Sequence, residues 1–559
     1  MELLYWPLPS AEDPASGYRG FDPHTEILPA GYQAQEGRLP FACDTLLQQD
    51  LACTVRDGTT LYMDIYRPVG AEKVPAIVAW GPWGKRGRNL ASGFTNDWKP
   101  KNTGLPEVCQ VSGLQANNGQ DPAIWVQYGY AIVNVDPRGV YASEGDMRYF
   151  GLQDSRDAYD VIEFLAAQDW CTGKIGLSGN HWYGLEQWFI AAQQPPHLYA
   201  MAPADAHGNL YREEFCRGGI PRMDYTARER SYTTHGGRCE DICGMLEQHP
   251  LFDEYWAEKA ARVEDIHIPC YVTASWTQTN HSRGPFENFE RLGTDKKWLR
   301  VHNGGEFTEF RAPETVADVR RFFDRYLKDE ENGWEDTPRV RLTTLDPGGD
   351  TVEGRPMPDF PLPNEKAVSL YLSADGRLHD APVEDAASVS YTADDDKSVC
   401  CFTYPFDRET EITGYAALRL YLAAECADAD VFVRLFKLDA QGNKLWTSTG
   451  NLYSGTNGRL RASHRALNAE KSTALRPWHD HTAEAPLTPG EIVRLDIDLW
   501  PMSMVFHPGQ QLMVEVSGWE IKVAHFSMTE MIPTRNRGSH TLWCGGAYDA
   551  CLTVPVIEG

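Results

Sequence analysis

One histidine stands at a turn where its side chain could act on a bound molecule. It is His181, in the stretch GKIGLSGNHWYGLEQW (173–188), which predicts a strand, a tight turn beside glycine and then a helix. The tip residue of such a turn projects into the space above the sheet. Imidazole exchanges protons near neutral pH, so the pattern predicts acid–base chemistry. Ser178, three residues before the tip, lies inside the predicted strand and is expected to point away from that space.

The segments that must position this turn alternate between apolar strands and amphipathic helices. Such alternation predicts a mostly parallel sheet covered by helices on both faces. Buried strands are predicted at 74–80, 130–139, 268–276 and 297–303, and helices at 154–170 and 314–329.

Interruptions of this pattern divide the chain into four predicted parts. Residues 204–264 break the alternation with helical patterns, which predicts a cap inserted over the sheet. After about residue 336, short alternating strands separated by Gly, Pro and Asp predict an all-β sandwich. The predicted parts are an N-terminal arm (1–50), an α/β domain (51–203 and 265–335), a helical cap (204–264) and a C-terminal β domain (336–559).

Composition limits the partners of the chain. It has 559 residues, with 79 acidic and 52 basic side chains and a net charge of −27. Such a charge repels phosphate backbones and anionic lipid, so neither nucleic acid nor a membrane is an expected partner. The N-terminal residues lack the basic and apolar segments of a secretory signal, and the 13 cysteines are scattered and odd in number. We therefore expect a cytoplasmic protein.

Several long stretches are similar to a known family. They include VRDGTTLYMDIYRP, VNVDPRGVYASEG, LTPGEIVRLDIDLWPMSMVFHPGQQLMVEVS and GGAYDACLTVPVI. From about residue 50 to its end, the chain resembles the cocaine esterase and X-prolyl dipeptidyl peptidase superfamily, called CocE/NonD. The resemblance implies an α/β-hydrolase-fold domain with a helical cap insertion, followed by a C-terminal jelly-roll sandwich.

The chain departs from that family at the positions that carry its chemistry. Family members use a serine at the turn, an aspartate, a histidine and a tyrosine hydroxyl that helps to form the oxyanion hole. Aligned on the motifs, these positions fall in the same order on His181, Gln278, Glu306 and Trp83. The changes remove acyl transfer by a serine, which needs a hydroxyl, an imidazole base and an orienting carboxylate.

The replacements suggest a different reaction. If the backbone is kept, His181 and Glu306 lie close together, and the carboxylate would favour a charged imidazolium suited to proton transfer near neutral pH. The Trp182 backbone N–H and the Trp83 indole N–H could stabilise an oxyanion. We therefore expect a cofactor-independent lyase, isomerase or cyclase that acts on a small metabolite. Simple packing of His181 in a lost active site is the alternative interpretation of the same residue.

Other residues are weaker candidates for the site. Asp205 and His207 follow another predicted strand end and could reach the same space. His281, near the lost acid position, could partner His181 in place of Glu306. His235, Cys239 and Cys243, like His479 and His481, have ligand-like side chains but lack the spacing of a zinc site, so no metal is expected.

Two further functions compete with the lyase hypothesis. One is a hydrolase of esters or amides whose water is activated by His181, or whose His181 forms an acyl intermediate. The other is a non-catalytic relative that binds a ligand or scaffolds an assembly. The expected partners are a small-molecule substrate and a second copy of the chain in a homodimer.

Overall fold

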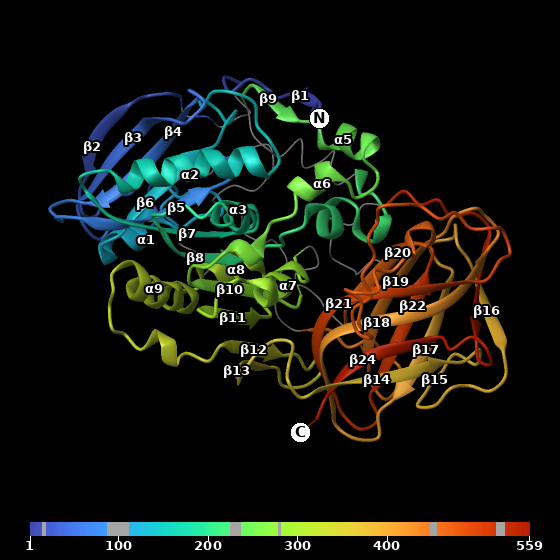
Figure 1. Ribbon diagram of the computed structural model, residues 1–559. Helices are drawn as coiled ribbons and strands as arrows, with labels where there is room; N and C mark the ends of the chain where they lie inside the picture. The colour runs from blue at the N-terminus through green and yellow to red at the C-terminus, as the bar shows by residue number, and fades with distance from the viewer. Residues whose placement is uncertain are drawn as a thin grey trace.

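The computed structural model describes residues 1–13, 18, 20–86, 111–223, 236–277, 281–447, 455–520 and 532–558. Two large sheets build the molecule, and Figure 1 shows them side by side. The first lies in an α/β domain, and the second forms the all-β C-terminal domain.

The first sheet has eleven strands in the order β13-β12-β11-β10-β8-β7-β5-β6-β4-β3-β2. The strands from β12 to β6 in this order run parallel, whereas β4 pairs antiparallel with β6 and β13 with β12. Parallel strands bring their carboxyl ends to one edge, where α/β sheets bind ligands. The strands are β2 (His24–Leu28), β3 (Thr45–Thr54), β4 (Thr60–Pro68), β5 (Val74–Trp80), β6 (Ala131–Asp136), β7 (Cys171–Asn180), β8 (Leu198–Ala204), β10 (Cys270–Ser275), β11 (Lys297–His302), β12 (Val340–Thr344) and β13 (Val352–Met357).

Helices cover both faces of this sheet, as the alternating sequence predicts. Helices α2 and α3 pack on one face, and the apolar side of α9, including Phe322 and Phe323, packs with Ile77 and Ile132 on the other. Strand residues alternate between the two cores because successive side chains point to opposite faces. The helices are α1 (Pro122–Trp125), α2 (Leu152–Ala166), α3 (Trp182–Ala191), α7 (Gly284–Arg291), α8 (Glu306–Arg311) and α9 (Pro313–Leu327).

A cap of short elements follows β8. It begins with one turn of π-helix, Tyr211–Phe215, and its strand β9 pairs with β1 from the N-terminus. The described part of the cap is thus helical with one short strand. Its other elements are η5 (Arg217–Gly219), α5 (Ile242–Gln248), α6 (Glu254–Glu258) and η6 (Val263–Asp265), and the pair of strands is β1 (Tyr5–Pro7) with β9 (Arg238–Glu240).

The C-terminal domain is an all-β sandwich whose strands pair antiparallel throughout. Strands β18 and β21 are its longest, and alternate side chains of each enter the core. The strands are β14 (Glu365–Leu372), β15 (Leu378–His379), β16 (Ala387–Thr392), β17 (Val399–Pro405), β18 (Thr410–Ala424), β19 (Asp430–Leu438), β20 (Asn457–Arg461), β21 (Val493–Phe506), β22 (Gln511–Ser517), β23 (Ser539–Cys544) and β24 (Cys551–Ile557).

The structure corrects two predicted domain limits. Residues 24–28 and 45–54 are strands at the edge of the first sheet, so the segment 1–50 is more than an arm lying on the domain. At the other edge, β12 and β13 extend the same sheet to Met357, beyond the predicted limit at residue 335. Sandwich pairing begins at β14 because the chain crosses to the second domain after β13.

Charged side chains fix the two domains against each other. Glu290 of α7 accepts hydrogen bonds from the Tyr415 hydroxyl at 2.6 Å and from Arg476 at 2.7 Å, both in the C-terminal domain. Arg283 donates to Asp498 of β21 at 3.1 Å. The Arg217 guanidinium of the cap lies 3.7 Å from the centre of the Trp500 ring.

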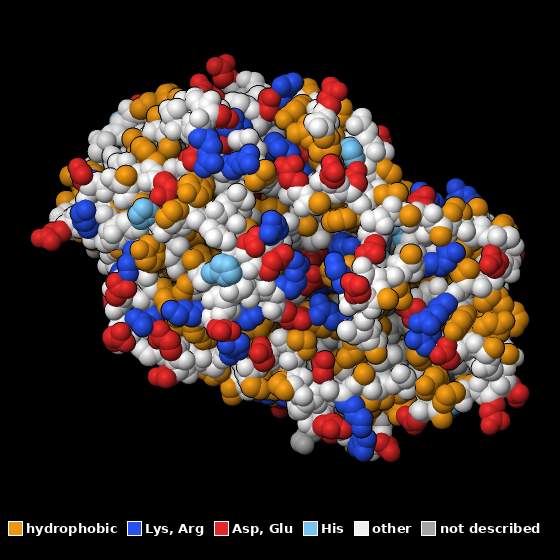
Figure 2. Space-filling model, in the orientation of Figure 1, with side chains coloured by type: hydrophobic (Ala, Val, Ile, Leu, Met, Phe, Trp, Pro, Cys, Tyr) orange, Lys and Arg blue, Asp and Glu red, His pale blue; other side chains and the backbone are white. Residues whose placement is uncertain are grey.

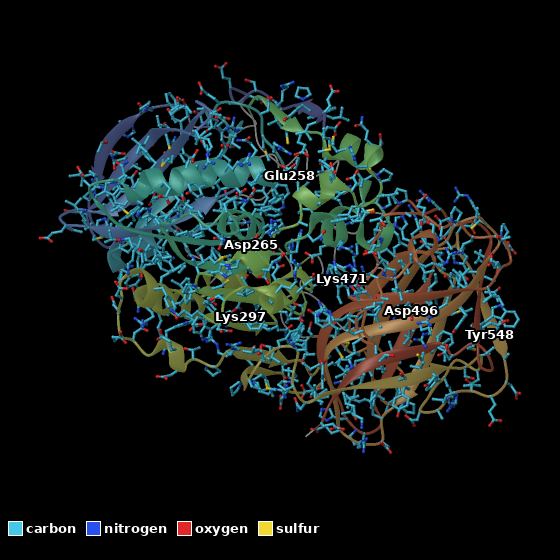
Figure 3. The ribbon with its side chains drawn as sticks, viewed as in Figure 1. Glu258, Asp265, Lys297, Lys471, Asp496 and Tyr548 are labelled. Atoms are coloured by element: carbon cyan, nitrogen blue, oxygen red, sulfur yellow. The ribbon has the colours of Figure 1, made fainter. Side chains whose placement is uncertain are left out.

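The surface mixes charges of both signs. Figure 2 shows acidic and basic side chains interspersed over the visible face of both domains. Figure 3 labels Glu258 and Asp265 near the end of the cap and Asp496 on the sandwich. Within the described ranges, every helix is too short or too polar to cross a bilayer.

Candidate active site

A strained turn holds His181 at the carboxyl end of β7. The residue has φ 54° and ψ −125°, a backbone conformation that residues other than glycine rarely adopt. The turn is tight enough that a Cβ on Gly179 would lie 2.4 Å from the Tyr183 Cβ. Helix α3 starts at the next residue, Trp182, and its first hydrogen bonds run to the His181 carbonyl. We call residues 178–184 the elbow.

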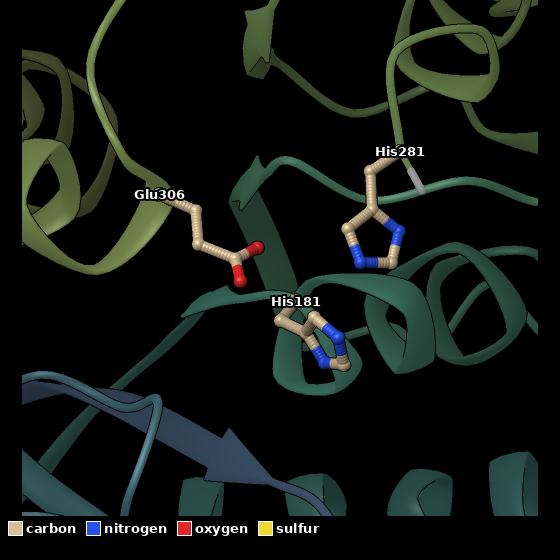
Figure 4. A group of neighbouring side chains, drawn as sticks. All are labelled: His181, His281 and Glu306. Atoms are coloured by element: carbon tan, nitrogen blue, oxygen red, sulfur yellow. The ribbon is translucent and has the colours of Figure 1, made fainter. Parts of the chain in front are cut away.

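Three side chains from three strand ends meet above the elbow. His181 follows β7, His281 follows β10, and Glu306 follows β11 at the first position of α8. Figure 4 shows the Glu306 carboxylate and the His281 ring directed toward His181. One donor atom from each lies within 4.8 Å of the others, and the two imidazole rings meet edge-on with centroids 4.5 Å apart. We call these three residues the site cluster.

A third histidine extends the site cluster. The Nδ1 atoms of His207 and His281 are 2.9 Å apart, so one donates a hydrogen bond to the other. His207 Nε2 in turn lies 3.6 Å from a carboxylate oxygen of Glu214. The structure thus brings His207 to the site through its hydrogen bond with His281.

Asp205 takes a different partner. Its carboxylate lies 3.1 Å from His302 Nε2, and both side chains are buried. His302 is the last residue of β11, four residues before Glu306. Neither His302 nor Glu214 is among the site residues predicted from the sequence. His302 could have been found, because it is a histidine at the end of a predicted strand. Glu214 lies in the cap, and no sequence motif distinguishes it.

Burial sets the protonation of these histidines. Loss of hydration lowers the pKa of His181 to about 3 and that of His207 to about 3. The pKa of His281 is also well below its usual value. The larger cause is burial, and the second is the neighbouring His181. The expectation that a carboxylate would hold His181 as an imidazolium is therefore wrong, because desolvation dominates. All three rings are neutral at neutral pH.

Aromatic rings form a wall beside the site cluster. The Trp83 ring centroid lies 5.6 Å from that of His181 and 5.5 Å from that of Trp182. Trp83 is almost completely buried, whereas His181 keeps part of its surface accessible. The proposed roles of the Trp83 indole and the Trp182 backbone N–H as oxyanion donors stay predictions. Gln278 lies outside the described residues.

Ser178 does not take the place of the missing nucleophile. It lies in β7 with 1% of its surface exposed, and its hydroxyl accepts a hydrogen bond from the Gln120 amide at 2.8 Å. A serine tied to a buried amide in a strand cannot approach a bound molecule as the elbow tip does. The expectation from the sequence is therefore confirmed.

The other ligand-like residues lie elsewhere. Cys239 is buried with its thiol directed to the Glu240 carbonyl, and His235 lies outside the described residues. His481 pairs with His464 in the C-terminal domain, with their Nδ1 atoms 3.1 Å apart. In the parts of the chain that the structure describes, two groups of three donors could hold a metal, and both include His281. Each cysteine in those parts is a free thiol.

Comparison with known proteins places this geometry in a family. Residues 57–239 match the model of the X-Pro dipeptidyl-peptidase (S15 family), and residues 332–553 match that of the X-Pro dipeptidyl-peptidase C-terminal non-catalytic domain. A crystal structure of a CocE/NonD family hydrolase from Staphylococcus aureus superposes with a TM-score of 0.88 and 31% identity, over 98% of this chain and 100% of that one. The chain belongs to the CocE/NonD family of hydrolases.

More distant members agree with this assignment. The cocaine esterase of Rhodococcus sp. (strain MB1 Bresler) is 24% identical over 567 residues, which cover 83% of this chain and 89% of the esterase. An alpha-amino acid ester hydrolase shares the fold with a TM-score of 0.67 and 18% identity, over 98% of this chain and 100% of that one. Both predicted parts of the fold, the α/β-hydrolase domain and the C-terminal β sandwich, are thus confirmed for this CocE/NonD member.

Proposed function

We propose that this CocE/NonD member hydrolyses an ester or amide bond of a small molecule, with activated water in place of a serine as the nucleophile. Membership in a hydrolase family supports the class of reaction. The observation that carries the proposal is the elbow, which presents His181 beside His281 and Glu306 where the family presents a serine hydroxyl.

Water is the nucleophile that this arrangement favours. A water molecule can donate hydrogen bonds to the neutral imidazoles and to the Glu306 carboxylate, and no hydroxyl stands at the tip. The backbone N–H of Trp182, in the first turn of α3, has no partner within the helix and could donate to the carbonyl oxygen as it becomes negative. The aromatic wall of Trp83 and Trp182 suits an apolar substituent of the substrate.

The lyase, isomerase or cyclase hypothesis has less support. The relatives described above are named as hydrolases or esterases. We therefore favour hydrolysis, the alternative function from the sequence. The small-molecule substrate, the cytoplasmic location, the lack of nucleic-acid and membrane partners and the homodimer stay predictions.

The test is turnover of a panel of p-nitrophenyl esters and aminoacyl p-nitroanilides by the wild type and two variants. We expect His181→Ala to lower kcat/KM at least about 100-fold, since positioned acid–base groups contribute that much or more. Ser178→Ala is the matched control within the elbow and should leave kcat/KM nearly unchanged. Turnover lost in Ser178→Ala and kept in His181→Ala would contradict the proposal. A wild type that binds these compounds without cleaving any would support the ligand-binding alternative instead.

A further inference from the structure

The donors of the site cluster match a metal site of a particular type. Two imidazoles and one carboxylate are a set that catalytic zinc uses, with a fourth position left for water. At zinc–ligand distances near 2.1 Å, tetrahedral ligands lie about 3.4 Å from one another. The donors of His181, His281 and Glu306 all lie within 4.8 Å of one another, so small side-chain rotations would close the set around an ion.

The orientation of His281 favours a ligand role. Its Nδ1 faces His207, which leaves Nε2 as the nitrogen directed toward the site cluster (Figure 4). Among the described residues, the buried His281 Nε2 has no hydrogen-bond partner. A buried nitrogen without a partner is costly, and a bound ion would remove that cost.

The neighbours of His281 resemble the outer shell of a metal site. A ligating histidine usually gives its second ring nitrogen to a hydrogen-bond partner that fixes the ring. Here that partner is His207, which is followed by the Glu214 carboxylate 3.6 Å further on. The hydrogen bond between His207 and His281 would orient His281 and make it a stronger ligand, whereas the contact between His207 and Glu214 is too long for a hydrogen bond.

The other group of donors is a poorer site. It consists of His207, Glu214 and His281. The His207 and His281 nitrogens within it are already 2.9 Å apart, in hydrogen-bond contact. That separation is shorter than the roughly 3.4 Å between tetrahedral zinc ligands, so an ion would have to break the pair. His181, in contrast, keeps accessible surface through which water could enter.

We propose that His181, His281 and Glu306 bind one divalent transition-metal ion, with zinc as the best match, and that His207 positions His281. The inference rests on the proposed hydrolysis for its chemical role. Metal-bound water would lose a proton and attack the carbonyl carbon as hydroxide. A carbon–oxygen bond forms, the bond to the leaving group breaks, and the leaving group departs with the proton. The sequence-based expectation of no metal would then be wrong, because the ligands follow three different strands and are far apart in the sequence.

The experiment uses the untagged full chain after removal of metals with a chelator. Titration with zinc chloride, followed by calorimetry and elemental analysis, should give one zinc per chain. Cobalt chloride should produce the intense visible absorption bands of a tetrahedral Co²⁺ site. We expect His281→Ala to weaken zinc binding at least about 100-fold, and His207→Ala to weaken it about 10–100-fold, as loss of an outer-shell partner does.

His302→Ala is the matched control, since His302 is a buried histidine outside the site cluster. It should bind zinc with the affinity of the wild type, and circular dichroism should show each variant to be folded. Zinc binding well below one per chain, or unchanged binding in His281→Ala, would overturn the inference. Ester turnover that persists fully in the metal-free protein would overturn it too while leaving the proposed hydrolysis intact. Zinc binding without turnover on any substrate would instead retain the site and contradict the proposed function.

Discussion

At the scale of single residues, the site has the His181 imidazole at the position that aligns with the family's serine hydroxyl. The elbow keeps the strained backbone that exposes its tip residue, yet the tip carries an imidazole. The imidazole beside a serine at the tip would be that of His281, whose ring centroid lies 4.5 Å from that of His181. Burial holds the pKa of His281 well below its usual value, so this ring accepts a proton poorly.

This environment predicts the result of restoring the family's nucleophile. We expect His181→Ser to show no efficient esterase activity, because a serine without a competent base remains protonated. Neither the wild type nor the variant should react with a fluorophosphonate probe on the hour scale, as measured by intact-protein mass spectrometry. Rapid and stoichiometric labelling of the introduced serine would mean that a working base is already present.

At the scale of elements, the strand–turn–helix unit depends on glycine where β7 approaches α3. A Cβ at position 179 would overlap the Tyr183 side chain at 2.4 Å, and both residues are held in regular structure. We expect Gly179→Ala to lower the free energy of unfolding by about 1–3 kcal/mol, the range for overpacking, and to abolish turnover by moving the tip. Urea denaturation and the ester assay measure the two effects.

Gly305→Ala is the matched control for that variant. It precedes Glu306 of the site cluster, has φ −68°, and has open space where a Cβ would lie. Its free energy of unfolding should stay within about 0.5 kcal/mol of the wild type. Equal losses in the two variants would show that the elbow is not specially constrained.

The elements were largely predictable from the sequence, whereas the contacts between loops were not. Helix α9 and strands β5 and β10 bury apolar side chains. The order of apolar residues along the sequence therefore shows the 3.6-residue period of the helix and the apolar runs of the strands. The closeness of His181 and Glu306 was expected from the resemblance to the family, whose motifs align on these two positions, and the structure brings them together. The pairs His207–His281 and Asp205–His302 join loops that have no periodicity, and only the folded chain brings them together.

The edge strands were missed for a related reason. Residues 24–28 are mostly exposed, and no run of apolar residues distinguishes them from a polar arm. The pKa of His181 could not be read from the sequence either. A pair of residue types suggests attraction between charges, but the degree of burial, which decides the outcome here, depends on the whole fold.

At the scale of the whole molecule, charged contacts help to hold the sandwich on the α/β domain. We expect Glu290→Ala to lower the free energy of unfolding by about 2–3 kcal/mol, since it removes charged hydrogen bonds to Tyr415 and Arg476. Chemical denaturation monitored by tryptophan fluorescence measures the change. The control is Glu264→Ala, which breaks an exposed pair with Arg291 and should cost less than about 1 kcal/mol. Similar losses in the two variants would show that the contact between domains is not a significant source of stability.

Arg283 connects the sandwich to the site cluster. It stands two residues after His281 and is tied to Asp498 on β21. A displacement of Asp498 would therefore act, through Arg283, on the segment that carries His281. Any coupling free energy between a ligand held by His281 and the Arg283–Asp498 contact is reciprocal, so each stabilises the other by the same amount. The domain that the family model describes as non-catalytic thus contacts, through Asp498, the segment that carries His281.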